Sequence, residues 1–282
     1  MNVYSIGRIF LGISLIGIGI MHFFFPGIRP IILPNLSNIP SFLYWTVYLT
    51  AIVLIGSGIL ISIGKRITAV SLIIGIGFFL LFLFGHLPSF LSATTRADKL
   101  KYWVNLNKTL ALSGGFLILA SVNMKDTAGE KIKSFFNAVL IVGKCFFALM
   151  LLLFGIGHLT STTSLSALVP KYIPFAKFWT FAGGIILVVS AISIFVNFKV
   201  KKIAFILSIT LFVWLVTLHL YYTFLFPHWQ EGENFIGSLT CLAFCGTALL
   251  ISRNAKISST ATTNKLNVQA ANEAKEQISF QR

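Results

Sequence analysis

The sequence predicts an all-α integral membrane protein with eight transmembrane helices, arranged as two parallel four-helix repeats. Three observations support this prediction: the chain is strongly apolar, its apolar stretches are long enough to cross a bilayer, and its second half repeats its first. Of 282 residues, 56% are hydrophobic and only 10% are charged, and the mean hydropathy is +0.89. Soluble domains carry about 25% charged residues, so this chain lacks the polar surface that water requires.

Apolar runs divide the chain into candidate spans. A helix needs about 20 apolar residues to cross the hydrocarbon core, and it satisfies its own backbone hydrogen bonds there. The runs occupy residues 6–25, 43–63, 67–87, 104–121, 135–158, 178–196, 203–225 and 235–251. The pairs Gly114-Gly115 and Gly183-Gly184 predict close approach between helices.

An internal repeat relates the two halves. The matched motifs include Gly19-Ile20-Met21-His22 with Gly155-Ile156-Gly157-His158, Tyr44-Trp45-Thr46 with Phe178-Trp179-Thr180, Ile39-Pro40 with Ile173-Pro174, His86-Leu87 with His219-Leu220, and Asn105-Leu106 with Asn234-Phe235. Four spans is an even number, so both copies enter the membrane from the same side and are related by an axis along the membrane normal. We expect repeats at 1–124 and 135–252, and a polar, disordered cytoplasmic tail at 253–282.

The charge distribution predicts the orientation. The chain has 22 basic and 7 acidic residues, a formal charge of +15. The side that holds the N-terminus carries fourteen of the basic residues and the opposite side six. Because lysine and arginine accumulate in cytoplasmic loops, we expect a protein of the bacterial inner membrane with both termini in the cytoplasm. The positive charge is then explained by the loops, so we expect no nucleic-acid partner.

Ionisable residues gather near the predicted outer face. His22, His86, His158 and His219 lie at the outer ends of odd-numbered runs, and Lys108 lies one turn into the fourth. No Asp or Glu falls inside an apolar run, which argues against a pump or cation-coupled carrier. Histidines at helix C-termini also cap free carbonyls, and a lysine can extend to the headgroups. We predict instead that His22, His86 and Lys108 converge on one ligand, with His158 and His219 as counterparts in the second copy.

Other chemistry has weaker support. Histidines on different helices could ligate haem or another metal, but no spacing in the sequence establishes this. The three cysteines all lie in apolar runs: Cys145, Cys241 and Cys245. Because Cys241 and Cys245 are one turn apart on one helix, their geometry is poor for a disulfide, and packing is the simpler explanation.

Several of these stretches resemble the DoxX-like family of bacterial membrane proteins: Gly7-Arg8 to His22-Phe23, Leu33-Pro34, Tyr44-Trp45-Thr46, His86-Leu87-Pro88 and Asn105 to Lys108. The resemblance covers residues 5–121 and recurs more faintly over 141–252, which implies a fused tandem pair of four-helix units. The namesake is similar to a subunit of a membrane thiosulfate:quinone oxidoreductase, and other relatives are linked to thiol redox or methylamine-enzyme maturation. The second copy departs from the family pattern, with Tyr221 where Pro88 would fall and no lysine.

Three functions compete. The first is an accessory or quinone-facing component of a membrane redox system, with a membrane or periplasmic redox partner and a quinone as the candidate ligand; haem is a weaker candidate. The second is a small-solute channel or carrier, whose site should lie at mid-membrane. The third is a non-catalytic scaffold or assembly factor. We favour the first and expect no catalysis by the isolated chain.

Overall fold

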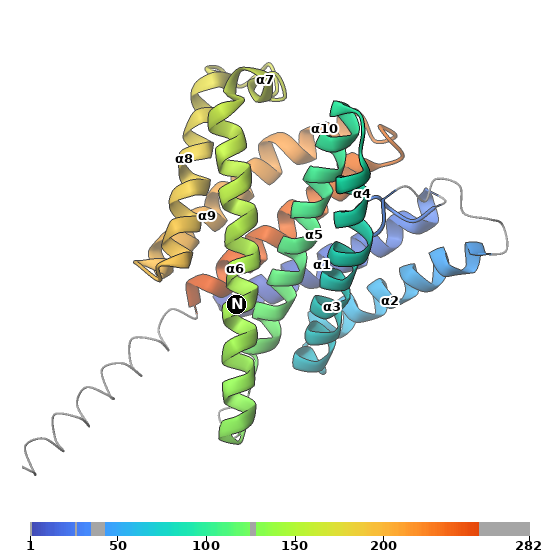
Figure 1. Ribbon diagram of the computed structural model, residues 1–282, viewed down its shortest axis with the longest axis vertical. Helices are drawn as coiled ribbons and strands as arrows, with labels where there is room; N and C mark the ends of the chain where they lie inside the picture. Colours follow the sequence, from blue (N-terminus) through green and yellow to red (C-terminus); the bar gives the residue numbers. More distant parts are fainter. Residues whose placement is uncertain (1, 26, 35–42, 125–127, 254–282) are drawn as a thin grey trace, which may run out of the picture.

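The computed structural model describes residues 2–25, 27–34, 43–124 and 128–253 (Figure 1). Within these ranges the regular structure is helical, and no strand occurs. Arg253 ends the last helix; the rest of the predicted polar tail and the Ile39-Pro40 motif lie outside the described residues.

Two helices of the first half, its first and its last, begin with a side-chain cap. The helices are α1 (Val3–Phe24), α2 (Tyr44–Ile63), α3 (Ile67–Leu81), a π-helical turn η2 (Phe82–His86), α4 (Leu87–Ser92) and α5 (Arg96–Val122). The Asn2 side chain caps α1 by accepting from the Ser5 N–H at 2.8 Å, and the Thr95 hydroxyl caps α5 by accepting from the Asp98 N–H at 3.0 Å. Short polar side chains at these positions satisfy N–H groups that have no partner inside the helix.

The second half follows the same order. Its helices are α6 (Glu130–Thr160), α7 (Thr162–Ser166), α8 (Ala176–Phe195), α9 (Val200–Trp214), a π-helical turn η3 (Leu215–His219), α10 (Leu220–Leu225) and a last helix, Glu233–Arg253. In both halves a π turn that ends in a histidine interrupts the third long helix. The apolar runs 67–87 and 203–225 predicted these helices but not their π turns, because the extra residue in a π turn leaves no mark on hydropathy. Such turns often occur at functional sites.

Seven helices are long and apolar enough to cross a membrane. They are Val3–Phe24, Tyr44–Ile63, Ile67–Ser92, Glu130–Thr160, Ala176–Phe195, Val200–Leu225 and Glu233–Arg253. Their outward faces carry large apolar side chains, as at Ile52, Ile73 and Phe84, which are 61%, 69% and 72% exposed. Burying this surface in lipid removes it from water, so the helices confirm a polytopic membrane protein.

The eighth predicted span is α5, which is long enough but less apolar than the other seven. Every residue from Thr109 to Ala120 is buried, so α5 touches protein on all sides. The last helix is also central, with 78% of its apolar window buried, against 28–44% for the other six. Figure 1 shows these two helices in the middle of the molecule, between α1–α3 on one side and α6, α8 and α9 on the other. The polar residues that make α5 less apolar lie between Arg96 and Lys108, before this buried segment.

Four glycines join the two halves. A Cβ at Gly7 would lie 2.8 Å from the Gly246 carbonyl, and one at Gly246 would lie 2.6 Å from that of Gly7. Gly114 on α5 and Gly143 on α6 form the same reciprocal contact, at 2.6 and 2.8 Å. Backbones approach this closely only where no side chain intervenes. The predicted close packing at Gly114 is confirmed, and α1 packs on the last helix as α6 packs on α5.

The two glycine contacts bear on the alignment of the predicted repeats. They correspond to one another if Gly7 matches Gly143 and Gly114 matches Gly246. Gly114 follows Asn105 by nine residues, whereas Gly246 follows Asn234 by twelve. The pairing of Asn105 with Asn234 is therefore shifted by about one helical turn from the pairing that the packing favours.

Candidate functional site

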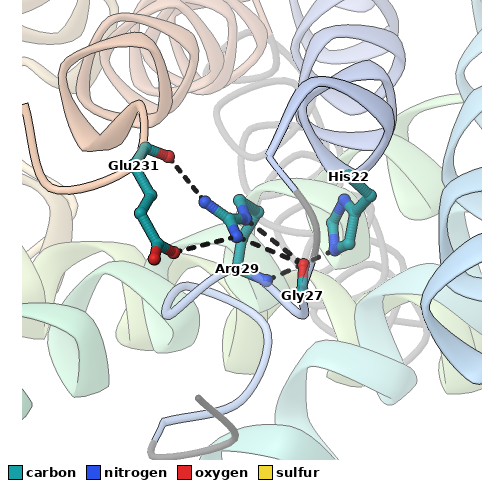
Figure 2. Close-up of polar contacts among 4 residues, drawn as sticks. All are labelled: His22, Gly27, Arg29 and Glu231. Atoms are coloured by element: carbon teal, nitrogen blue, oxygen red, sulfur yellow. Dashed lines mark hydrogen bonds and ion pairs between the residues drawn. The ribbon is translucent and has the colours of Figure 1, made fainter. Parts of the chain in front are cut away.

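A buried arginine ties the two halves together at one end of the bundle. Arg29, in the loop after α1, is only 1% exposed. Its Nη1 donates to the Glu231 carbonyl oxygen at 2.6 Å, while Nε and Nη2 lie 3.4 and 3.3 Å from the Gly27 carbonyl oxygen. Its Nη2 is also 3.5 Å from Glu231 Oε2 (Figure 2). Glu231 belongs to the loop before the last helix, so this arginine connects a loop of the first half to a loop of the second.

His22 lies under this loop as a neutral imidazole. Its Nδ1 is 2.8 Å from the Ile18 carbonyl oxygen, which can only accept, so Nδ1 carries the proton. Its Nε2 then accepts from the Arg29 backbone N–H at 3.4 Å (Figure 2). The contact with Ile18 is the one expected of a histidine that caps its own helix, and the contact with Arg29 extends it to the loop.

His86, at the end of η2, binds the same loop from another helix. Its Nε2 is 3.2 Å from the Ile31 carbonyl oxygen and 3.1 Å from the Thr109 hydroxyl of α5. That hydroxyl donates to Ile31 at 3.0 Å. The ring is fully buried, and its Nδ1 has no hydrogen-bond partner among the described residues. His22 and His86 therefore meet through the 27–33 loop.

Lys108 faces the second half instead. Its ammonium is within electrostatic range of the Glu233 carboxyl group, of the Cys241 thiol and of the His219 ring at the end of η3. Glu233, Gly237 and Cys241 follow one another at intervals of four residues, so they line one face of the last helix. A Cβ at Gly237 would be 3.4 Å from His219 Nδ1. The His219 ring thus lies beside Gly237, and Lys108 is near the same end of the last helix.

Glu233 begins the last helix, two residues before the predicted apolar run. Glu130 likewise begins α6, five residues before its run. Both carboxylates lie outside the apolar runs, at helix starts, where the helix dipole favours negative charge. Glu130 is exposed and pairs with Lys133 at 3.1 Å. Glu233 is partly buried and interacts with Lys108, Arg29 and Lys101.

The remaining histidines lie elsewhere. His158 Nδ1 is 2.8 Å from the Phe154 carbonyl oxygen, and its ring stacks on Trp214 at a centroid distance of 6.0 Å. His228 meets Phe25 edge to face. In the described part of the chain no three His, Cys, Asp or Glu side chains come together as metal ligands would. The five predicted ligand-binding residues therefore do not form one cluster. His22 and His86 contact the 27–33 loop, Lys108 and His219 lie near the last helix, and His158 stacks on Trp214.

Arg29, Thr109 and Glu233 are the residues that the sequence analysis missed. Arg29 was counted only as a loop charge, and Thr109 carried no signal. Glu231 and Glu233 could have been noticed, because they are two of only seven acidic residues and stand together before a span.

Comparison of the chain with protein-family models, with curated proteins and with solved structures gives no match. The resemblance to the DoxX-like family stays a prediction from the sequence motifs.

Proposed function

We propose that the chain is an eight-span protein of the bacterial inner membrane that binds the polar headgroup of a lipid-soluble molecule, such as a quinone, as an accessory component of a membrane redox system. In this proposal α5 is the eighth span, residues 1–124 and 135–252 are tandem DoxX-like repeats, and both termini are cytoplasmic. The headgroup binds between the two repeats at the outer end.

The position of Lys108 is the observation that supports this proposal most directly. A lysine within a membrane helix is costly unless its ammonium reaches a partner or water, so Lys108 calls for a partner. Lys108 lies beside Glu233 and His219 on a face of the last helix that has no side chain at Gly237. An ammonium in such a place donates strong, charge-assisted hydrogen bonds to an anionic or carbonyl oxygen.

The surrounding contacts support a structural role for the other polar residues. Arg29, His22, His86 and Thr109 bind one another or the 27–33 loop, which covers this end of the first repeat. We propose that they hold the loop in place, while Lys108 and His219 face the ligand. His158, which stacks on Trp214, is left out of the ligand site.

Calorimetric titration of the full chain in detergent tests this function, with a decyl-tailed benzoquinone as the probe. We expect Lys108→Met to weaken binding about tenfold or more, because one charge-assisted hydrogen bond is lost. Lys144→Met is the matched control, since Lys144 is also a partly buried lysine within a membrane helix, and it should bind like the wild type. Absence of binding to the wild type, or unchanged binding by Lys108→Met, would refute the proposal.

A further inference from the structure

Arg8 and Lys144 occupy matching places in the two halves but differ in their partners. Each directly follows a glycine of the reciprocal contacts described above. The Arg8 guanidinium donates to the carbonyl oxygens of Ile61 and Ser62 at the end of α2, the latter at 3.0 Å. The half-buried Lys144 makes no hydrogen bond or ion pair within the described ranges. A lysine inside a membrane helix calls for a partner, and the described chain does not supply one.

The packing of α1 on α2 shows how Arg8 reaches its partners. A Cβ at Gly19 on α1 would lie 2.9 Å from the Ala51 carbonyl oxygen on α2. Arg8 is eleven residues before Gly19, which is about three turns, so both lie on the same face of α1. Gly64 is thirteen residues after Ala51, and a Cβ there would lie 3.0 Å from Arg8 Nη1. Arg8 therefore faces the turn that follows α2.

The same register places Lys144 against the turn that follows α8. A Cβ at Gly155 on α6 would lie 3.0 Å from the Gly184 carbonyl oxygen on α8. Lys144 is eleven residues before Gly155, and Asn197 is thirteen residues after Gly184. The two turns also share a backbone conformation, because Gly64 and Asn197 are both left-handed, with φ of 83° and 53°. Lys144 therefore faces the α8–α9 turn as Arg8 faces the α2–α3 turn.

This turn is strongly basic. It leads into three exposed lysines: Lys199, Lys201 and Lys202. None of the described acidic residues belongs to α8, to α9 or to the turn between them. Glu130 starts α6 fourteen residues before Lys144, about 21 Å along the helix. The positive charge beside Lys144 thus has no carboxylate to balance it in this part of the described chain.

Apolar side chains surround the same place and are open to the bilayer. Ile141 on α6 is 62% exposed, and Val196 and Phe198 at the end of α8 are 63% and 58% exposed. In a membrane such side chains contact acyl chains. A ligand that reaches Lys144 from this side therefore combines a negative group with hydrocarbon tails.

We propose that Lys144 and the lysines at 199–202 bind the phosphate group of an anionic phospholipid, whose acyl chains lie along Ile141 and Val196. Lysine ammonium groups donate charge-assisted hydrogen bonds to phosphate oxygens, and clustered basic residues at a membrane surface favour anionic over neutral lipids. The first half lacks this site, because Arg8 is already bound to the end of α2. The lipid site includes neither Lys108 nor His219 and does not rest on the proposed function.

Native mass spectrometry of the full chain in detergent tests this site with three probes: phosphatidylglycerol, phosphatidylcholine with the same acyl chains, and inorganic phosphate. We expect the wild type to bind phosphatidylglycerol at least about fivefold more tightly than phosphatidylcholine, and to bind inorganic phosphate more weakly than either. Lys144→Met should weaken phosphatidylglycerol binding about fivefold, because one basic residue near an anionic lipid is lost. Lys144→Arg keeps the charge and should bind phosphatidylglycerol like the wild type.

Lys65→Met is the matched control, since Lys65 is an exposed lysine in the equivalent α2–α3 turn, and it should bind phosphatidylglycerol like the wild type. If Lys144→Met fails to fold, Lys199→Met, in an exposed turn, should weaken phosphatidylglycerol binding instead. Equal weakening by Lys144→Met and Lys65→Met would reduce the effect to overall charge and overturn the site. Equal binding of the two lipids by the wild type would overturn it as well. Binding of inorganic phosphate as tight as that of phosphatidylglycerol would show an anion site and overturn the assignment to a lipid.

Discussion

Replacement of Arg29 by methionine should destabilise the protein by about 2–3 kcal/mol. The guanidinium makes one contact of good geometry, the 2.6 Å bond to the Glu231 carbonyl oxygen. Its contacts to the Gly27 carbonyl and to Glu231 Oε2, at 3.3–3.5 Å, are long and weak. A hydrogen bond from a charged donor contributes about 1.5–3 kcal/mol, and the carbonyl left behind would lose its partner.

The side chain of Glu231 should contribute much less than its backbone. Because this side chain is 76% exposed and only one of its oxygens lies at 3.5 Å from Arg29, its removal in Glu231→Ala should cost about 0.5 kcal/mol or less. The structure therefore predicts an asymmetric pair, with a large effect of the arginine and a small effect of its acidic neighbour.

Titration of the purified protein with SDS in mixed micelles, followed by helicity, measures both free energies of unfolding. Arg96→Met is the control, since Arg96 is an exposed arginine at the start of α5, and it should change the free energy by less than about 0.5 kcal/mol. If Arg29→Met is as stable as the wild type, or if Arg96→Met lowers the free energy of unfolding as much as Arg29→Met does, the buried arginine does not stabilise the contact between the loops. If Glu231→Ala costs as much as Arg29→Met, the ion pair, not the carbonyl bond, is the main contact.

Three further predictions follow from the fold. Reporter fusions after residues 95 and 128 should lie on opposite sides of the membrane, outer then inner; the same compartment for both would remove α5 as a span. In the same SDS titration, Gly114→Ala should cost about 1–3 kcal/mol, because its Cβ would meet the Gly143 carbonyl at 2.6 Å. Gly77→Ala is the control and should not destabilise the protein, because no atom lies within 4 Å of a Cβ there. Equal effects of the two substitutions would contradict the packing. Thr109→Val should cost about 1 kcal/mol by removing its bond to the loop carbonyl. Thr210→Val should cost less, because the Thr210 hydroxyl bonds only to the Ile206 carbonyl of its own helix; the reverse order would exclude Thr109 as a link.

The sequence predicted the parts of this fold that depend on local composition. The expected runs and the observed helices agree to within a few residues at most ends, because hydrophobic length determines both. The largest difference is at α5, predicted from 104 and observed from Arg96. Its first two turns are polar and are held by the Thr95 cap, a signal that hydropathy does not contain.

The candidate site was predictable only in part, because its contacts join distant segments. The histidines and Lys108 were recognised as polar residues in apolar surroundings, which a sequence shows directly. Their partners were not: Lys108 faces Glu233, and Arg29 binds Glu231 across 202 positions. The half of the molecule that each side of α5 contacts depends on how α5 and the last helix pack together, and hydropathy does not contain that information. Lys108 and Thr109 are neighbours in sequence, yet they face different halves.

The reciprocal glycine contacts have a consequence for how the protein is made. Gly7 near the start of the chain packs on Gly246 near the end of the described residues. During synthesis α1 therefore enters the membrane long before its partner exists, and its glycine surface must stay against lipid, or against an insertion factor, until the last helix leaves the ribosome. By contrast α5 and α6 emerge one after the other and can associate at once. A chain that stops before residue 233 would contain one of the two glycine contacts and lack the other, so quality-control proteases should recognise it even though its first half is complete.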